Sequence, residues 1–402
     1  MRILLVSQYF YPENFKGNDI AFELAKRGYQ VDVLTGIPNY PGGKYLQGYG
    51  VFKKRIETIN GVRVYRAFQF PRGESNKLLM VLNYLSYPFF ASLYVLFFFL
   101  WRKYDAIIVQ QLSPIFQAFP AILMKKIKRI PVYMWVLDIW PDALRSAAGV
   151  KNEKIIDIVD RFVQHIYKNC DKLLISSKRF ESLINSKRDY SDKTIYFPNW
   201  SDDILKMDDS YEIPHLLGGF KIMIAGNLGK SQNLEAVTEV MLGLKDVPEV
   251  NWVFVGGGSR KEWLEEFIKE NGLEDRAVCL GQYPFKAMPA FYKQADAMLV
   301  TLRAGFPHLE AVVPARLQSY MSAGKPVLAM IGCGGADIIQ EADCGYSVPA
   351  GDSKSLAFVI KNSVLTDQEG FKKKGENGRK YFERNYQLDM CINNLCNILE
   401  KE

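Results

Sequence analysis

The chain has 402 residues, of which 48% are hydrophobic and 24% are charged. This length suits two α/β domains, and this composition excludes an intrinsically disordered chain. The formal net charge of +7 fits an anionic partner, whether a phosphate-bearing ligand, an acidic lipid surface or a nucleic acid. The six cysteines form no C-x-x-C pair, and the chain has only three histidines, so we expect reduced thiols and no metal site.

The first half of the chain alternates short apolar runs with helical stretches. The N-terminal run is too short for a signal peptide, and we interpret it as a buried strand. A helix is predicted over Asp19–Arg27, with Gly28 as its C-cap. Strands are predicted at Ile3–Val6, Gln30–Leu34, Ala106–Val109, Val132–Leu137 and Lys172–Ser176.

The same alternation restarts after Asn199–Gly219, a polar and turn-rich segment that we interpret as a linker. Strands are then predicted at Phe220–Ile224, Trp252–Val255, Ala277–Leu280, Ala297–Val300 and Pro326–Met330. Two α/β halves with parallel sheets follow from this repetition. Ligands of such folds bind beyond the carboxyl ends of the strands, so the cleft between the two halves is the expected site.

Leu78–Trp101 is a run without charged residues that is long enough to span a bilayer. A true span is disfavoured, because the predicted strands before and after it must pair in one sheet. A helix pair buried in the soluble core is a second reading. We favour a third, in which a monotopic hairpin or helix lies in the lipid interface, since its aromatic residues and neighbouring basic groups suit that location.

Asp138 follows an apolar strand and is flanked by Trp135 and Trp140. A carboxylate at the carboxyl end of a strand lies at the edge where ligands bind, and it can bind a sugar hydroxyl or take a proton. The alternative is a helix N-cap, a role that Asp142 would also fill. We predict a functional role for Asp138.

Glycine loops between strands and helices mark two further positions. Gly17 precedes a predicted helix, where backbone N–H groups are open to a ligand. Gly226 and Lys230 lie in a second such junction, an arrangement that suits a diphosphate. The junction at Val253–Gly258 has the same form, although a tight turn would explain it equally well.

The segment Leu302–Pro326 carries polar residues in a stretch that otherwise looks buried. Pro314 suits the first turn of a helix and Gly324 its end. Arg316 near this helix start would meet an anion, and Gln318 would bond ribose hydroxyls. The alternative is a capped amphipathic helix with surface charge.

Together these motifs resemble the family 4 glycosyltransferases of the GT-B fold, in which two Rossmann-like parallel-sheet domains face a cleft. The most similar subgroup includes the colanic-acid fucosyltransferase-like and O-antigen N-acetyl-L-fucosaminyltransferase-like enzymes. The motifs that carry the resemblance are SQYFYPENFKG, LTGIPNYPGG, VLDIWPD, FPNW, AGNLGKSQNLE, VFVGGG, LGQYPFKAMPAFYKQAD and VPARLQSYMSAGKPVLA. The implied domains are 1–200 for the acceptor and membrane, 201–375 for the nucleotide sugar, and 376–402 as a C-terminal helix crossing back.

The resemblance also implies site residues. Many members carry Glu-x7-Glu, whose best match here is Glu310 and Gln318. Glu310 would touch the donor sugar and act with Asp138 as a catalytic residue. The implied donor-binding residues are Gly226, Asn227, Lys230, Gln232, Gly257, Tyr283, Arg316, Leu317 and Gln318. The implied acceptor-binding residues are Phe15, Lys16, Gly17 and Asn39.

This chain departs from the family pattern beside the pyrophosphate. Many members have an arginine and a lysine after the first strand of the second half, where Asn227 and Gln232 stand here. Two positive charges are therefore missing. Lys230 and Arg316 are our candidates to replace them.

The implied reaction moves a sugar from a nucleoside diphosphate sugar to a lipid-linked sugar acceptor in bacterial surface polysaccharide (O-antigen or capsule) synthesis. We lean toward UDP with a deoxy or N-acetylated hexose such as N-acetyl-L-fucosamine. Retention at the anomeric carbon, no essential metal and no further cofactor are also implied. The protein would be peripheral (monotopic) on the cytoplasmic, inner face of the cell membrane.

Two alternatives remain open at this point. One is a nucleotide-sugar epimerase of the same fold, and the other is a non-catalytic membrane-bound scaffold with a degenerate nucleotide site. A nucleic-acid partner is not expected, because the basic groups are scattered and no recognised motif accompanies them.

Overall fold

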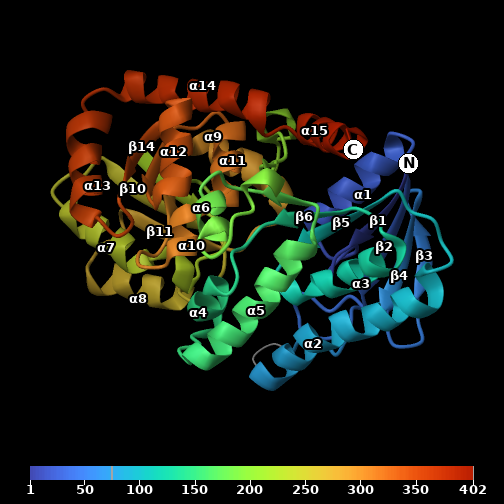
Figure 1. Ribbon diagram of the computed structural model, residues 1–402. Helices are drawn as coiled ribbons and strands as arrows, with labels where there is room; N and C mark the ends of the chain where they lie inside the picture. The colour runs from blue at the N-terminus through green and yellow to red at the C-terminus, as the bar shows by residue number, and fades with distance from the viewer. Residues whose placement is uncertain (74–75, 402) are drawn as a thin grey trace. The chain divides into compact units, whose positions relative to one another are not determined.

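The computed structural model describes residues 1–73 and 76–401, and the chain divides into two compact units (Figure 1). Unit 1 comprises Met1–Phe197 and Ile392–Glu402, and unit 2 comprises Pro198–Cys391. Each unit is built around its own sheet, so the prediction of an α/β protein with two Rossmann-like parallel sheets is confirmed.

Unit 1 contains the strands β1 (Arg2–Val6), β2 (Gln30–Gly36), β3 (Ile56–Ile59), β4 (Val62–Ala67), β5 (Ala106–Gln111), β6 (Val132–Val136), β7 (Lys172–Ile175) and β8 (Thr194–Tyr196). Their order in the sheet is β3-β4-β2-β1-β5-β6-β7-β8, and every neighbouring pair except β3–β4 is parallel. β1 pairs with both β2 and β5. The central strands are apolar runs buried along their length, as expected for a sheet covered on both faces.

The antiparallel β3–β4 hairpin was not predicted. Its two strands are joined at Asn60 and Gly61, which have φ values of 49° and 81°. Positive φ at both central residues is the requirement of a type I′ turn, and Asn-Gly is the dipeptide that meets it most readily. The Asn-Gly pair between two β-rich runs was therefore a signal in the sequence.

Unit 1 contains the helices α1 (Lys16–Lys26), α2 (Lys77–Tyr94), α3 (Phe119–Lys128), α4 (Asp142–Ala148), α5 (Glu153–Asn169) and α6 (Phe180–Asn185). α5 shows why these segments are helical. Asn152 caps its N-terminus by accepting the N–H of Lys154 at 3.0 Å, and its buried residues recur every three or four positions.

α2 is a single helix that continues into a π-helical turn at Val95–Phe99. By length and composition alone Leu78–Phe99 could cross a membrane, yet only 33% of its most apolar window is buried. Phe89 and Phe97 are 61% and 68% exposed, whereas Tyr87 is fully buried. The alternative of a helix pair buried in the core is therefore wrong.

Unit 2 contains β9 (Phe220–Ala225), β10 (Val250–Val255), β11 (Ala277–Gly281), β12 (Ala297–Thr301), β13 (Val327–Met330) and β14 (Gly345–Val348). The sheet is parallel throughout, with the order β11-β10-β9-β12-β13-β14. All strands predicted from apolar runs are present, and the short strands β8 and β14 were missed. Successive residues of β9 enter two different cores, with Ile222 in one and Met223 in the other.

The helices of unit 2 are α7 (Leu234–Gly243), α8 (Lys261–Glu270), α9 (Met288–Gln294), α10 (Pro307–Ala311), α11 (Ala315–Ser322), α12 (Cys333–Ala342), α13 (Ser353–Val359) and α14 (Gln368–Asn385). Where we expected one terminal helix over 376–402, α14 and α15 (Leu388–Glu400) are separate. Tyr386 ends α14 because its φ of −131° is not helical, and its side chain is buried in the core of unit 2. From Ile392 onward the chain belongs to unit 1, where Asn393 accepts a hydrogen bond from Arg27 at 3.2 Å.

Candidate active site

The topology of each sheet marks the place where a ligand is expected. In unit 1 the chain reverses its direction of growth between β1 and β5, and in unit 2 it does so between β9 and β12. Ligands of open parallel sheets bind beyond the carboxyl ends of the strands at this switch point. We therefore describe the residues that follow β1, β5 and β6 in unit 1, and β9, β10 and β12 in unit 2.

Asp138 lies two residues beyond the end of β6 and is held by its neighbours. The Ser113 hydroxyl donates to the Asp138 Oδ2 at 2.7 Å, and the Trp140 indole N–H donates to the same hydroxyl at 3.1 Å. The N-cap alternative is wrong, because α4 begins at Asp142 and its capping position is Pro141. Ser113 was missed from the sequence, since nothing in the order of residues shows that the loop after β5 reaches Asp138.

The environment of Asp138 changes its acidity. Burial raises the pKa of this carboxyl to about 6, against the opposing effect of the Ser113 hydrogen bond. A carboxylate whose pKa lies close to neutrality is suited to accept a proton during a reaction. This geometry makes Asp138 the candidate base or orienting group of unit 1.

The predicted acceptor residues lie at the start of α1 and in the loop after β2. Phe15 precedes α1 and stacks on Tyr9, with ring centroids 5.3 Å apart, and Lys16 opens the helix. Gly17 lies inside the first turn, where a Cβ would come within 2.2 Å of the Gln110 side-chain oxygen. The glycine therefore makes room for protein packing, and its predicted place before the helix is wrong.

Asn39 is fully buried, and its partners are protein groups. Its side-chain nitrogen donates to the carbonyl oxygen of Ile37 at 2.9 Å, and its side-chain oxygen accepts the N–H of Arg72 at 3.0 Å. A fully buried side chain cannot touch an acceptor in this conformation. Asn39 is better explained as a residue that fixes its loop.

Glu13 is a buried carboxylate that was not predicted as a site residue. It accepts the N–H groups of Asn39 at 2.8 Å and Tyr40 at 2.7 Å, and so joins the loop after β1 to the loop after β2. Burial raises the pKa of Glu13 to about 7, although these backbone hydrogen bonds act in the opposite direction. Its signal in the sequence was an acid within an otherwise aromatic loop.

In unit 2, the glycine loops after β9 and β10 are joined closely. A Cβ on Gly256 would lie 1.9 Å from the carbonyl oxygen of Gly226, and Gly256 has a φ of 146°. The N–H of Leu228 donates to the carbonyl oxygen of Gly257 at 2.8 Å. The close approach of Gly256 to Gly226 requires a glycine at position 256, and Gly226 itself brings no side chain to the end of β9.

Arg316 reaches this exposed backbone from α11. The Tyr320 hydroxyl, one turn later, bonds both the N–H and the carbonyl of Ala225, at 3.1 and 3.2 Å, and so fixes α11 to the end of β9. The Arg316 guanidinium then lies 3.3 Å from the position of a Cβ on Gly226, and it donates to the carbonyl oxygen of Asn227 at 3.1 Å. Its Nη1 is buried without a hydrogen-bond partner.

Two cavities flank the segment that follows β12. One, of about 410 Å³, is lined by Lys230, Asn233, Glu235, Arg260 and Arg303. The other, of about 430 Å³, contains Glu310 beside the ends of β13 and β14. The side chain of Glu310 accepts the N–H of Gly305 at 3.2 Å. The structure thus brings Lys230 and Glu310 to the two sides of Arg303 and Ala304.

The sequence of the chain is similar to those of known glycosyltransferases. Residues 211–381 match the model of the family described as Glycosyl transferases group 1. WcaI of Escherichia coli K12, whose name places it among colanic acid biosynthesis glycosyl transferases, is 25% identical over 81% of this chain and 82% of its own. The O-antigen chain mannosyltransferase C of Escherichia coli is 23% identical over 99% and 98%.

A solved structure extends the match to the fold. Anabaena HepE in complex with UDP superposes with a TM-score of 0.71 and 16% identity, covering 100% of both chains. The chain is a glycosyltransferase. Its two Rossmann-like units are those of the GT-B fold, as predicted.

Two predicted donor residues of this glycosyltransferase, Leu317 and Gln318, are buried, and a third, Tyr283, is half-buried. Leu317 is fully buried in the core, and Gln318 is 1% exposed. In the orientation that satisfies its neighbours, the Gln318 amide donates to the carbonyl oxygens of Pro314 and Ala315, at 2.9 and 3.0 Å. The Gln318 side chain therefore hydrogen-bonds the backbone at the start of its own helix, α11. Tyr283 is half-buried and packs edge-on against Phe291.

The two positions that lack the usual charges belong to the loop after β9. Asn227 is exposed, and Gln232 offers its carbonyl oxygen to the Thr301 hydroxyl at the end of β12. Arg260 and Arg303 were not predicted as site residues, and they place two guanidinium groups beside Lys230. Arg260 is paired with Glu235, and the Arg303 N–H donates to the carbonyl oxygen of Ser231 at 2.9 Å.

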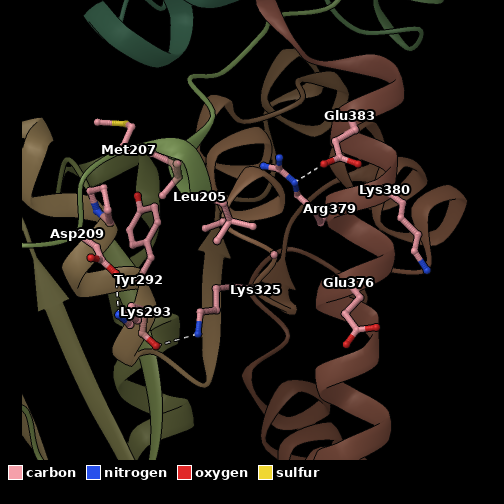
Figure 2. A pocket seen from close by; sticks show the side chains of 14 residues that line it. Leu205, Met207, Asp209, Tyr292, Lys293, Lys325, Glu376, Arg379, Lys380 and Glu383 are labelled. Atoms are coloured by element: carbon pink, nitrogen blue, oxygen red, sulfur yellow. Dashed lines mark hydrogen bonds and ion pairs between the residues drawn. The ribbon is translucent and has the colours of Figure 1, made fainter.

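Another cavity of the glycosyltransferase, of about 630 Å³, lies away from this edge (Figure 2). Lys325, which lines it, precedes β13 and so stands at the amino end of that strand. The Lys325 ammonium donates to the carbonyl oxygens of Lys293 and Ala295, at 3.0 and 2.8 Å. Burial lowers the pKa of Lys325. Its hydrogen bonds are made to the protein, so we do not assign this cavity to the donor.

Proposed function

We propose that the protein transfers a sugar from a nucleoside diphosphate sugar to a lipid-linked glycan acceptor during bacterial surface polysaccharide synthesis. The observation that carries the proposal is the Arg316 guanidinium held over the bare backbone of Gly226 at the switch point of unit 2. A guanidinium with an unpartnered, buried Nη1 needs an anion, and a diphosphate supplies one.

The chemistry assigned to the chain follows from these positions. The bond between the anomeric carbon and the diphosphate breaks, and a new bond forms from that carbon to the acceptor oxygen. The departing diphosphate gains charge, which Arg316 and Lys230 stabilise without a metal ion. Asp138 orients the acceptor hydroxyl or takes its proton, and Glu310 binds the donor sugar. We propose retention at the anomeric carbon.

UDP is the nucleotide that we favour. Anabaena HepE, which shares the fold over the whole chain, is described in complex with UDP. A deoxy or N-acetylated hexose is our proposal from the resemblance of the motifs to the colanic-acid and N-acetyl-L-fucosaminyltransferase-like subgroup. The relatives WcaI and O-antigen chain mannosyltransferase C support the polysaccharide class, and the second of them is named for mannose. O-antigen or capsule synthesis is the proposed pathway class.

A peripheral position on the cytoplasmic face of the membrane completes the proposal. α2 exposes Leu78, Phe89 and other large apolar side chains, which a water-exposed helix would not retain without use. β4 precedes α2 and β5 follows it in the same sheet, so the helix starts and ends on one unit. This arrangement favours a helix that lies in the lipid interface.

Thermal unfolding with a panel of UDP-, GDP- and dTDP-sugars tests the donor assignment. A ligand that binds only the native state raises the melting temperature, and we expect the UDP sugars to do so. The stabilising donor is then incubated with a lipid-linked acceptor. Product formed from the donor alone would indicate an epimerase, and a protein that binds no nucleotide sugar would indicate a scaffold.

A further inference from the structure

An apolar groove of about 480 Å³ lies on unit 1 between α2, α3 and α5. This volume is within the roughly 300–1,000 Å³ of small-molecule sites. Its lining includes Leu85 and Phe89 from α2, Phe119 and Leu123 from α3, and Phe162 from α5. Leu85 and Phe162 are 53% and 45% exposed, so this side of the protein presents unburied hydrocarbon.

One end of the groove is linked to Asp138 by a chain of side-chain contacts. The Phe116 ring lines the groove, and it lies 5.9 Å from the ring of Phe162 and 6.0 Å from that of Trp140. Trp140 donates to the Ser113 hydroxyl, which bonds the Asp138 carboxylate. The Trp140 ring and the Ser113 hydroxyl therefore connect this end of the groove to the candidate base.

The other end of the groove is polar. Lys126 follows Leu123 by one turn of α3, and its ammonium lies 3.3 Å from the Nε2 of His165 on α5. Between the two ends, the Ser92 hydroxyl is already used, since it donates to the carbonyl oxygen of Pro88 at 2.6 Å. The groove thus offers hydrocarbon contacts along its middle and few free polar groups.

We propose that this groove binds the hydrocarbon chain of the lipid-linked acceptor, with the acceptor sugar at Asp138. The inference rests on the proposed function and adds the position of the lipid. A peptide strand would bring backbone N–H and C=O groups that this lining leaves unbonded, at a cost in free energy. A hydrocarbon chain has no such groups. Its burial here makes transfer depend on the length of the acceptor's chain.

The test compares two acceptors with the same glycan, one on a long polyisoprenyl chain and one on a short water-soluble alkyl group. Both are assayed in detergent micelles, so that docking to a bilayer does not contribute. Ser92→Phe fills the groove, and Phe162→Gln makes it polar. We expect each variant to raise the KM for the long-chain acceptor about tenfold and to leave the short-chain acceptor unchanged.

Phe97→Gln is the matched control, because Phe97 is exposed on the same helical segment outside the groove. It should weaken binding to liposomes and leave both KM values unchanged in micelles. Equal effects on both acceptors, or an effect of Phe97→Gln as large as that of Ser92→Phe, would overturn the groove assignment. The thermal unfolding curve of each variant reports whether it is folded.

A photoreactive polyisoprenyl phosphate gives a readout that does not need activity. Cross-links in the wild-type protein are expected on α2, α3 and α5 around the groove, and Ser92→Phe should remove them. Cross-links elsewhere in an active enzyme would refute the inference alone. Cross-links in the groove of a protein that transfers no sugar would refute the proposed function and leave the lipid site standing.

Discussion

Asp138→Asn is expected to make the protein more stable and less active. Burial raises the pKa of Asp138 from 3.8 to about 6, which means that the folded protein resists ionisation of this carboxyl. Below pH 3.8 the group is neutral in both the folded and the unfolded state, so its charge costs nothing. As the pH rises through 6 the folded state must carry the charge, and stability is lost.

The size of the effect follows from the shift. Each pKa unit corresponds to about 1.4 kcal/mol, and two units give a penalty of about 3 kcal/mol at pH 7.5. Asparagine keeps the size of the side chain and can still accept from the Ser113 hydroxyl, but it carries no charge. Asp138→Asn should therefore unfold at a higher urea concentration than the wild type at pH 7.5, and the two should converge near pH 4.

Activity should change in the opposite direction. Loss of a base costs roughly 10²–10⁴-fold in rate, so kcat should fall while the melting-temperature shift caused by the donor stays the same. For the wild type, kcat should decline below about pH 6 as Asp138 takes up a proton. A variant that is destabilised at pH 7.5, or equally stabilised at both pH values, would refute the buried-charge argument.

Three further predictions concern unit 2. Arg316→Ala removes a charge-assisted contact and should raise the donor KM about tenfold or more. Lys293→Ala, at the cavity of Figure 2, is the control and should leave the donor KM unchanged. An unchanged donor KM in Arg316→Ala would exclude Arg316 from the donor site. Glu310→Gln should lower kcat/KM for the nucleotide sugar about tenfold and leave the affinity for the free nucleotide unchanged, and a loss of nucleotide affinity would contradict its place beside the sugar. Gly256→Ala forces a Cβ to 1.9 Å from the Gly226 carbonyl oxygen at a φ of 146°, and it should lower the free energy of unfolding by more than about 2 kcal/mol in urea titrations. Gly218→Ala is the control, because the space around Gly218 is open, and equal stability of the two variants would disprove the strain at Gly256.

The fold could be predicted from the sequence because most strands are apolar runs, in sheets whose two faces are covered by helices. Such runs stand out in the sequence, and they predicted five strands of each sheet to within two residues at each end. The edge strands β8 and β14 were harder to predict, since their residues are partly exposed and their composition is mixed. The β3–β4 hairpin was missed although Asn60-Gly61 indicated its turn.

The candidate site was harder to predict from the sequence, because its side-chain contacts join loops that are distant in the chain. Asp138 was found from its position after a strand, but its partner Ser113 comes from another loop. Asn39 and Gln318 have polar side chains that satisfy the protein itself, which a sequence cannot distinguish from ligand binding. Arg260 and Arg303 became visible only when the ends of β10 and β12 were seen together.

The two faces of α2 have a practical consequence for handling the protein. Its inner face carries Asn83, which accepts from the Tyr9 hydroxyl at 3.0 Å and from the Gln8 amide at 2.9 Å. Deleting the helix to improve solubility would thus unravel the loop after β1 as well. Polar replacements at exposed positions outside the groove, such as Phe97 and Phe98, should raise solubility and leave both the loop after β1 and the lining of the groove intact.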